Sequence, residues 1–334
     1  MSKNITIAVD AMGGDGSPKK IIDGIAHHNK NSKSIFYKIF GDKEKILSNF
    51  PSGLSKDVYE IFDTKNNVKG TDTPLEAAKR GKDTSMWLAI ESVKNKEADA
   101  IISAGNTGAL LVIAKLNLKM IENIDKPALS ALWPNEKGMS VVLDLGANIE
   151  CSDKNLIDFA VMGSSVFKSL YPNEIAKVAL LNIGSEEMKG NEVIKETYQK
   201  LNRIKSSDYE FKGYIEGNNL MKGDVNVIVS DGFTGNIALK TAEGTANFIT
   251  KELKKTFTNN IIGKLSGLIN YFNFKKFKKR LDPRLYNGAI FIGLDSPVIK
   301  SHGATDYIGF SNSLSVCEKI VRGDLISKIK SNIA

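Results

Sequence analysis

The sequence contains little cysteine: only Cys151 and Cys317 occur among 334 residues, and neither belongs to a CxxC pattern or a Cys/His cluster. Neither a disulfide framework nor a metal site is therefore indicated, and a reducing, cytoplasmic setting is expected. Long apolar runs are also absent, because none approaches the ~18 residues of a membrane-spanning helix. The strand expected after Met1–Asn4 is too short for the core of a signal peptide. We therefore expect a protein that does not span a membrane.

Internal repeats are lacking as well. No period of about 20 to 50 residues is visible, which argues against a solenoid or a propeller. Hydrophobic residues make up 42% of the chain and charged residues 25%, as in ordinary soluble globular proteins. At roughly 150 residues per domain, the length allows two domains or one large α/β unit.

Acidic residues are scarce in one stretch. Between Lys251 and Arg280, nine Lys or Arg residues accompany a single Glu, which gives a net charge of +8. The whole chain has 46 basic and 38 acidic residues, so this stretch carries the entire excess of +8 and the remainder is neutral.

The same stretch has an apolar helical face followed by a basic cluster, a combination typical of a segment that lies on an anionic membrane surface. A helical hairpin packed in a dimer interface would explain the pattern equally. Nucleic-acid binding is a third interpretation, but no recognised nucleic-acid-binding motif accompanies the basic run. The residues of this surface are Ile261, Ile262, Leu265, Leu268, Ile269, Phe272, Lys275, Lys276, Lys278, Lys279 and Arg280.

The stretch from Val225 to Lys240 is predicted to form a buried strand, a glycine turn and a helix. The β-branched run ends at Asp231-Gly232, and Thr234-Gly235-Asn236 leads into a helix expected from Ile237 to about Phe257. Unpaired backbone N–H groups converge at such a helix N-terminus, and the helix dipole favours negative charge. The pattern therefore predicts an anion site, most simply for phosphate.

This strand-turn-helix pattern recurs along the chain. In an open parallel sheet the carboxyl ends of the strands lie at one edge, where ligands bind, so the turns are expected to form a single polar site. In the first repeat, Ser17 and Pro18 are expected as helix N-cap and first helical residue. The other turns are Ala11–Gly16, Ala104–Gly108, Leu145–Asn148, Ile183–Ser185 and the segment Pro297–Gly303, which contains His302.

Two further features have more than one interpretation. Arg80 and Lys82 lie in a loop near a helix cap, where they are either solvated surface charge or part of the site. A loop histidine such as His302 is often structural, but this one lies beside a glycine turn, and we expect it in the site.

Taken together, several strings resemble the PlsX-type phosphate acyltransferases, in the order in which that family has them. One departure is visible, because the family commonly has His after GGD and this chain has Gly16. A role for that side chain cannot be transferred. The strings are VDAMGGD (Val9–Asp15), ISAGNTGAL (Ile102–Leu110), LDLGAN (Leu143–Asn148), KGNE (Lys189–Glu192), SDGFTGNIALK (Ser230–Lys240) and VIKSHG (Val298–Gly303).

The resemblance implies a three-layer α/β/α fold with a mostly parallel sheet, similar to isopropylmalate dehydrogenase and phosphotransacetylase. It implies one catalytic unit over residues 1–334, with 251–280 projecting, and usually a homodimer. It also implies formation of acyl phosphate from acyl carrier protein thioesters and inorganic phosphate, without a cofactor. Peripheral attachment to the cytoplasmic membrane is implied, with transfer of the product to a glycerol-3-phosphate acyltransferase. The 251–280 segment would then contact lipid, the acidic carrier or both.

Phosphate is already an anion at neutral pH, so positioning and charge stabilisation should supply most of the rate. We expect Lys189, Asn236 and His302 to be catalytic, with His302 protonating the leaving thiolate, and we do not expect Cys151 to be a nucleophile. The aspartates would orient Lys or Asn, cap turns or bind the pantetheine arm. The expected substrate- or phosphate-binding residues are Asp10, Gly13, Gly14, Asp15, Arg80, Lys82, Asn106, Thr107, Gly108, Asp144, Asn148, Asp231, Gly232, Thr234, Gly235, Lys300 and Ser301.

Rival functions are a phosphotransacetylase-like enzyme that uses coenzyme A, a dehydrogenase and a non-enzymatic scaffold. A dehydrogenase is disfavoured, because no GxGxxG with a following acidic residue occurs after the first strand. A scaffold would leave six polar glycine turns without a role.

Overall fold

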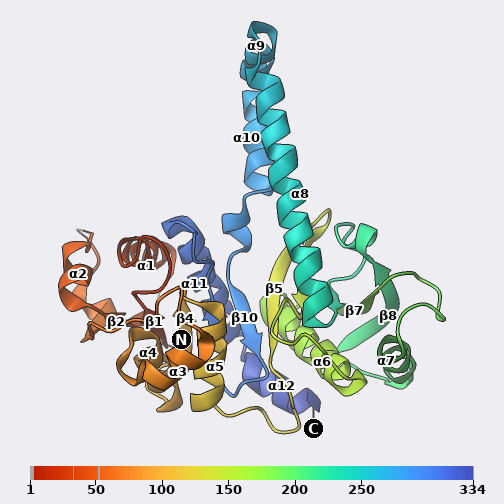
Figure 1. The fold of residues 1–334 in the computed structure, drawn as a ribbon, viewed down its shortest axis with the longest axis horizontal. Coiled ribbons are helices and arrows are strands. Elements are labelled where there is room, and N and C mark those ends of the chain that lie inside the picture. The colour runs from red at the N-terminus through yellow and green to blue at the C-terminus, as the bar shows by residue number, and fades with distance from the viewer. Residues whose placement is uncertain (1–3, 33, 52, 334) are drawn as a thin grey trace.

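The computed structural model describes residues 4–32, 34–51 and 53–333, which form a twisted sheet covered by helices on both faces (Figure 1). The strands are β1 (Ile5–Asp10), β2 (Ile35–Gly41), β3 (Tyr59–Asp63), β4 (Ala100–Ser103), β5 (Ala128–Asn135), β6 (Gly138–Leu143), β7 (Ala176–Asn182), β8 (Tyr209–Glu216), β9 (Val227–Val229), β10 (Ala289–Ile292) and β11 (Val298–Lys300). The α-helices are α1 (Lys19–Asn31), α2 (Lys43–Ser48), α3 (Pro74–Arg80), α4 (Ser85–Lys94), α5 (Thr107–Asn117), α6 (Asp153–Leu170), α7 (Glu192–Arg203), α8 (Gly232–Thr258), α9 (Ile261–Ile269), α10 (Tyr271–Arg280), α11 (Tyr307–Arg322) and α12 (Leu325–Ile333).

The strands follow the order β3-β2-β1-β4-β11-β10-β5-β6-β9-β7-β8. Most neighbours are parallel, but β10 is antiparallel to both β11 and β5, and β5 is antiparallel to β6. The expected mostly parallel α/β sheet is therefore confirmed. The three antiparallel steps reverse the direction, so that β6, β9, β7 and β8 run opposite to β1, β4 and β11.

This reversal contradicts the expectation that all glycine turns share one edge. The turns after β1, β4 and β11 lie at one edge of the sheet, and those after β6, β7 and β9 lie at the other. Neighbouring strands in a sheet are rotated by roughly 20°, so the five steps from β4 to β9 turn the strand direction by about 100°. The two groups of turns therefore form separate clusters. Because the sheet is twisted, these clusters do not point in directly opposite directions.

Side chains alternate between the two faces and define three layers. In β9, Val227 and Val229 pack with Phe159 of α6, whereas Ile228 packs against Ala238 and Ala242 of α8. In the other half, α1 and α11 cover one face of β1, and α4 and α5 cover the opposite face. This alternation confirms the α/β/α architecture.

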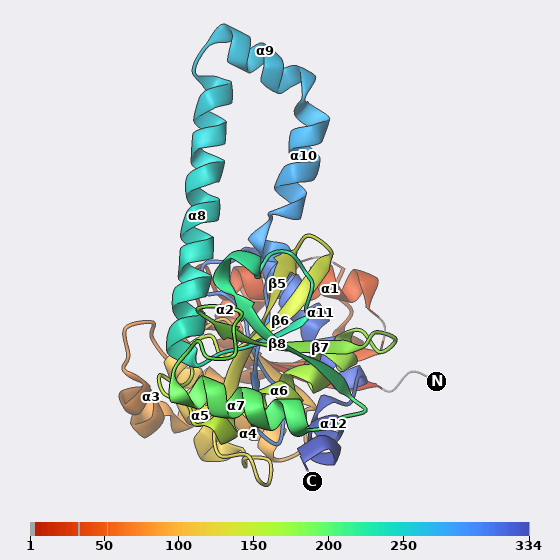
Figure 2. The same ribbon diagram turned by 90° about the vertical axis from the view of Figure 1, so that its right-hand side faces the viewer.

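Helices α8, α9 and α10 form an arm that extends far beyond the sheet, with α9 crossing its tip (Figure 2). The base of α8 packs on the sheet through Ala238, Leu239 and Ala242. Further out, the two long limbs touch through Phe257 and Phe274, whose ring centroids are 4.5 Å apart. Within the described residues, no helix is long and apolar enough to cross a membrane.

Three local expectations were wrong. Helix α8 begins at Gly232 rather than Ile237, because Asp231 is the N-cap and accepts from the Thr234 N–H at 2.8 Å. Helix α1 begins at Lys19, and the N-cap position is held by Pro18; the Ser17 hydroxyl instead donates to the Gly13 carbonyl. Part of the expected turn Pro297–Gly303 is strand β11, since Val298 and Ile299 are buried at the centre of the sheet.

Candidate active site

One cluster of turns gathers around the carboxyl ends of β1, β4 and β11. We call it the lysine cradle and define it as residues 10–15, 103–106 and 300–303 together with Lys20. The Asp10 carboxylate is buried and accepts from the hydroxyls of Ser85 and Ser103, both at 2.6 Å. Burial raises the pKa of Asp10, and these two hydrogen bonds oppose the rise.

Glycines let the turns of the lysine cradle pack backbone against backbone. A Cβ on Gly13 would lie 2.5 Å from the Gly105 nitrogen. Gly14 has φ +81°, and its Cβ would lie 2.7 Å from the Ala104 carbonyl oxygen and 2.9 Å from that of Gly303. A side chain at either position would push the turns apart.

Two lysines are buried in the lysine cradle, each with 8% of its surface exposed. The ammonium of Lys300 donates to the Ser301 carbonyl, and that of Lys20 donates to the Gly303 carbonyl. Burial lowers the pKa of Lys300 to about 8; the nearby charge of Lys20 contributes, and Asp10 opposes the shift. Burial also lowers the pKa of Lys20, against the attraction of Asp15.

His302 lies at the outer edge of this cradle. Its backbone N–H donates to Asn287 Oδ1 at 2.9 Å, and its Nδ1 accepts from the Ala304 N–H at 3.3 Å. Desolvation and the charge of Lys300 lower the pKa of His302, while Glu243 of α8 acts in the opposite direction. Helix α8 therefore passes close to the lysine cradle.

A cavity of about 290 Å³ adjoins the lysine cradle. The N-terminus of α5 borders it, where Asn106 caps the helix by accepting from the Ala109 N–H at 3.0 Å. The Asn106 amide also ties down the preceding loop by donating to the Asp72 carbonyl at 2.9 Å. Thr107 and Gly108 form the first turn of α5. The lining residues are Met12, Gly14, Asp15, Asn67, Val68, Lys69, Gly70, Ala104, Gly105, Asn106 and Gly303.

The second cluster, which we call the aspartate cradle, comprises residues 144–148 and 230–236. Its centre is the buried carboxylate of Asp144, which accepts from the backbone N–H groups of Leu129, Gly146, Ala147 and Asn148 at 2.7–3.2 Å. The Asn148 amide adds a further bond of 2.8 Å. Asp144 thus shapes the turn after β6.

The start of α8 rests directly on this turn. The Gly232 N–H donates to the Asn148 carbonyl at 2.8 Å, and a Cβ on Gly235 would lie 2.0 Å from the Asp144 carbonyl oxygen. The Asn236 side chain lies beside Gly146, where its atoms would be 3.6 to 3.7 Å from an added Cβ. Asp231 also holds the Thr234 hydroxyl at 2.8 Å.

Helix α8 links the two cradles. It begins in the aspartate cradle at Gly232, and Lys240 lies about 12 Å further along its axis at 1.5 Å per residue. Lys240 and Glu243 both influence the pKa of His302, so this part of α8 lies near the lysine cradle.

Other expected site residues lie outside the two cradles. Lys189 is exposed in the loop after β7, where its carbonyl accepts from the Asn182 amide at 3.2 Å. Arg80 and Lys82 are exposed on either side of Gly81, which packs near Ile113 in the middle of α5. The structure describes no contact between these two side chains and the glycine turns.

Three buried groups in or beside the lysine cradle were not expected from the sequence: Lys20 and Ser103, which belong to it, and Ser85 of α4, which donates to Asp10. Ser103 alone had a local signal, since it ends a strand before a glycine turn. For Cys151, burial and the charge of Asp144 raise the pKa to about 11, which disfavours a thiolate at neutral pH. Gly16, at the position where the family commonly has His, has φ +68° and open space around it.

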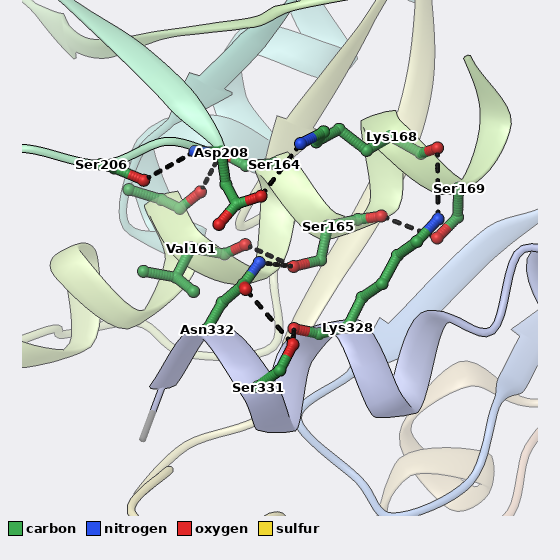
Figure 3. Close-up of polar contacts among 11 residues, drawn as sticks. Val161, Ser164, Ser165, Lys168, Ser169, Ser206, Asp208, Lys328, Ser331 and Asn332 are labelled. Atoms are coloured by element: carbon green, nitrogen blue, oxygen red, sulfur yellow. Dashed lines mark hydrogen bonds and ion pairs between the residues drawn. The ribbon is translucent and has the colours of Figure 1, made fainter. Parts of the chain in front are cut away.

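A larger cleft of about 400 Å³ lies elsewhere, between α6, the loop at residues 204–209 and α12 (Figure 3). Two of its lining residues are paired: Asp208 forms an ion pair of 2.9 Å with Lys168, and the Asn332 amide donates to Ser165 Oγ at 3.4 Å. None of the glycine turns lines it. The volume of a cavity alone therefore does not identify the candidate active site.

The comparisons with known proteins first define a class. A phosphotransacetylase from Streptococcus pyogenes superimposes with a TM-score of 0.62 at 15% identity, covering 97% of this chain and 94% of that one. A 4-hydroxythreonine-4-phosphate dehydrogenase from Klebsiella pneumoniae gives a TM-score of 0.50 at 12% identity, covering 96% and 100%. These likenesses show the fold, and the expected similarity of the fold to that of phosphotransacetylases is confirmed.

Sequence similarity then gives the family. The model described as "Fatty acid synthesis protein" matches residues 5–328. A phosphate acyltransferase of Pelagibacter ubique is 77% identical over 333 residues, covering 100% of both chains, and one of Rhodospirillum rubrum is 43% identical over 336 residues, covering 100% of this chain and 96% of that protein. The chain belongs to the phosphate acyltransferase family of lipid synthesis and is an acyltransferase.

Proposed function

We propose that the enzyme transfers a fatty acyl group from the thioester of acyl carrier protein to orthophosphate, which yields acyl phosphate and the free carrier thiol. The observation that carries this proposal is a cavity of about 290 Å³ whose wall residue Gly303 accepts a hydrogen bond from the buried ammonium group of Lys20 and lies three residues after the buried Lys300. Glycine turns, an open helix N-terminus and a buried ammonium group together suit a small multivalent anion.

The reaction needs little acid or base chemistry. A phosphate oxygen attacks the thioester carbonyl carbon, the new C–O bond forms, and the C–S bond breaks as the thiolate leaves. His302, at the edge of the lysine cradle, would protonate that thiolate. Because phosphate is already ionised, the enzyme supplies position and charge stabilisation.

The aspartate cradle would hold the carbonyl end of the acyl donor. Asn236 presents an amide above Gly146, and Lys189 projects from the neighbouring loop after β7. These groups would stabilise the oxyanion, while Asp144, Asp231 and Asn148 fix the backbone around them through hydrogen bonds of 2.7 to 2.8 Å. Carboxylates thereby contribute without touching the phosphate.

The arm would bring the enzyme to its partners. Ile261, Ile262 and Phe272 are 75 to 84% exposed at its tip, and Leu268 and Ile269 lie beside them at similar exposure. Lys275, Lys276, Lys279 and Arg280 follow on α10; the side chain of Lys278 lies outside the described residues. An apolar tip with an adjacent basic limb favours peripheral binding to an anionic membrane on the cytoplasmic side, or to the acidic carrier.

The proposal extends to assembly and to the fate of the product. Phe233, Ile237 and Phe248 leave an apolar stripe on α8, 50 to 65% exposed, which a second copy would cover in a homodimer. The whole chain would act as one catalytic unit with the arm projecting. Acyl phosphate would pass to an acyltransferase that uses glycerol-3-phosphate.

Acyl phosphate formation by Lys189→Ala and Asn236→Ala proteins tests the chemistry. We expect kcat to fall at least about tenfold in each, since each loses an oxyanion contact. Lys205→Ala is the control and should match the wild type, because Lys205 is exposed and lines the separate cleft beside α6 and α12. Near-normal kcat in both site variants would exclude these residues from the chemistry.

The choice of acyl donor separates this function from its closest rival. A phosphotransacetylase-like enzyme, which the fold also accommodates, would turn over acetyl coenzyme A faster than palmitoyl carrier protein. We expect the reverse preference. Equal or better turnover of acetyl coenzyme A would favour the rival.

A further inference from the structure

Lys20 occupies an unusual place for a lysine. It lies in the first turn of α1, between the exposed Lys19, which pairs with Asp23 at 2.8 Å, and the buried Ile21 and Ile22. Only 8% of Lys20 is exposed, and lysine is rarely buried unless its charge has a partner. The fold of α1 does not require a charge at this position.

The ammonium of Lys20 is directed at the cavity wall. It donates to the Gly303 carbonyl, which also accepts from the Asp15 N–H at 3.0 Å. It lies 2.9 Å from the point that a Cβ on Gly14 would occupy. Gly14, Asp15 and Gly303 all line the cavity of about 290 Å³.

Lys20 lies close enough to Lys300 for its charge to contribute to the lowered pKa of Lys300, after the larger effect of burial. An ammonium group has three donors, and the structure gives each of these two a single carbonyl acceptor. The nearest buried carboxylate, Asp10, is already bonded to Ser85 and Ser103. Two buried ammonium groups with spare donors therefore lie in the lysine cradle, whose residues Gly14, Asp15 and Gly303 line the cavity, and in the described residues no carboxylate is hydrogen-bonded to either of them.

We propose that Lys20 is a phosphate-binding residue, which together with Lys300 holds the orthophosphate substrate against the glycine turns of the lysine cradle. This inference rests on the proposed function, because it names the anion subsite of that reaction. A phosphate dianion neutralises the two ammonium groups and uses their free donors.

The test compares Lys20→Met and Lys20→Arg with Lys19→Met, which removes the exposed neighbouring charge. With acyl carrier substrate saturating, Lys20→Met should raise the KM for orthophosphate about tenfold or more, the effect of losing one charge-assisted contact. The KM for the acyl donor should stay unchanged. Lys20→Arg should recover part of the phosphate affinity, and Lys19→Met should match the wild type.

A second readout does not depend on turnover. Orthophosphate should raise the melting temperature of the wild type and of Lys19→Met, relative to sodium chloride at equal ionic strength, but not that of Lys20→Met. If Lys20→Met fails to fold, Lys20→Gln takes its place in both measurements. An unchanged KM for orthophosphate and an unchanged thermal shift in the folded neutral variant would overturn the inference.

The outcomes also separate this inference from the proposed function. If the wild type forms acyl phosphate and Lys20→Met has normal phosphate affinity, only the role of Lys20 is refuted. If the wild type forms no acyl phosphate but phosphate stabilises it through Lys20, the anion site stands and the acyl transfer proposal falls.

Discussion

Glycine and lysine occur both in the two cradles and in the projecting arm, but their surroundings differ. In the aspartate cradle, a Cβ on Gly235 would lie 2.0 Å from a backbone oxygen, whereas around Gly244, further along the same helix, nothing lies within 4 Å. In the lysine cradle two lysines are 8% exposed, whereas the arm carries its basic residues on exposed surface. Gly235 and the two buried lysines are therefore packed against backbone groups, whereas Gly244 and the described lysines of the arm are exposed to solvent.

This difference separates residues that serve folding from residues that do not. A glycine or lysine buried among backbone groups cannot change without disturbing its neighbours, so its effects on stability and on activity are entangled. An exposed Ile or Leu at the tip of α9 gains nothing from the fold, and exposed apolar patches commonly mark interaction surfaces. The arm is therefore where binding can be altered without unfolding the enzyme.

The largest effect is expected for Gly235→Ala. The added methyl would collide with the Asp144 carbonyl, and overpacking of this kind costs about 3 kcal/mol of unfolding free energy. Urea denaturation measures the loss, and activity should fall with it because Asn236 moves away from Gly146. A Gly235→Ala protein as stable as the wild type would show that the aspartate cradle accommodates the added methyl group without strain.

Gly244→Ala is the matched control in the same helix. With open space around it, alanine only improves helix propensity, so stability should rise by about 0.5 to 1 kcal/mol. A similar loss in both variants would mean that α8 tolerates no substitution anywhere, and the contrast between cradle and arm would disappear.

The next largest effect is expected for Leu265→Glu combined with Ile269→Glu at the tip of the arm. These residues are 61% and 75% exposed, so the unfolding free energy should change by less than about 0.5 kcal/mol. Binding to anionic vesicles should fall at least about tenfold in a flotation assay, because two apolar side chains no longer insert.

Leu116→Glu, on α5 and 63% exposed, supplies the control for this experiment and should float like the wild type. Unchanged flotation of the double variant would rule out an inserted apolar face. Loss of self-association in that variant, with lipid binding intact, would instead assign the hairpin to a dimer interface.

The sequence predicted local elements better than their arrangement. Strand and turn signals located β1, β4, β7 and β9 and the glycine turns after them, because β-branched runs and glycines act over a few residues. Strand direction depends on long connections, so the reversal at β10 and at the β5–β6 hairpin had no local signal. That hairpin turns at Glu136-Lys137, which lacks the Asn-Gly or Asp-Gly pair that marks tight turns.

The candidate site was predicted unevenly for the same reason. Asp10, Asp144, Asp231 and Lys300 lie at or just after strand ends, within three residues of a glycine, and this local signal placed them in the expected site. Lys20 lies inside an amphipathic helix, where a lysine is ordinarily solvated, so its burial becomes visible only when α1 is packed against the loop of Gly303. The effect of Lys240 and Glu243 on His302 likewise depends on where α8 runs.

The smallest effect is expected from a change of pH, which should alter the KM for orthophosphate a few-fold. This effect depends on the lysine cradle alone. Burial and Lys20 lower the pKa of Lys300 to about 8, against the attraction of Asp10. As the pH rises through about 8, Lys300 loses its proton in the folded enzyme, and the KM for orthophosphate should rise a few-fold. The unfolded chain keeps this proton until about pH 10.4, so it binds more protons than the folded chain between these values.

Stability should consequently change in the direction opposite to that of phosphate affinity. Where the unfolded state binds more protons, the unfolding free energy increases with pH, here by about 1 kcal/mol per pH unit at most. Measuring both quantities in the wild type and in Lys300→Met cancels the ionisation of phosphate itself, which is common to the two proteins. If Lys300→Met retains the full rise in the KM for orthophosphate, another group is responsible, and the buried lysine is not the cation that the anion meets.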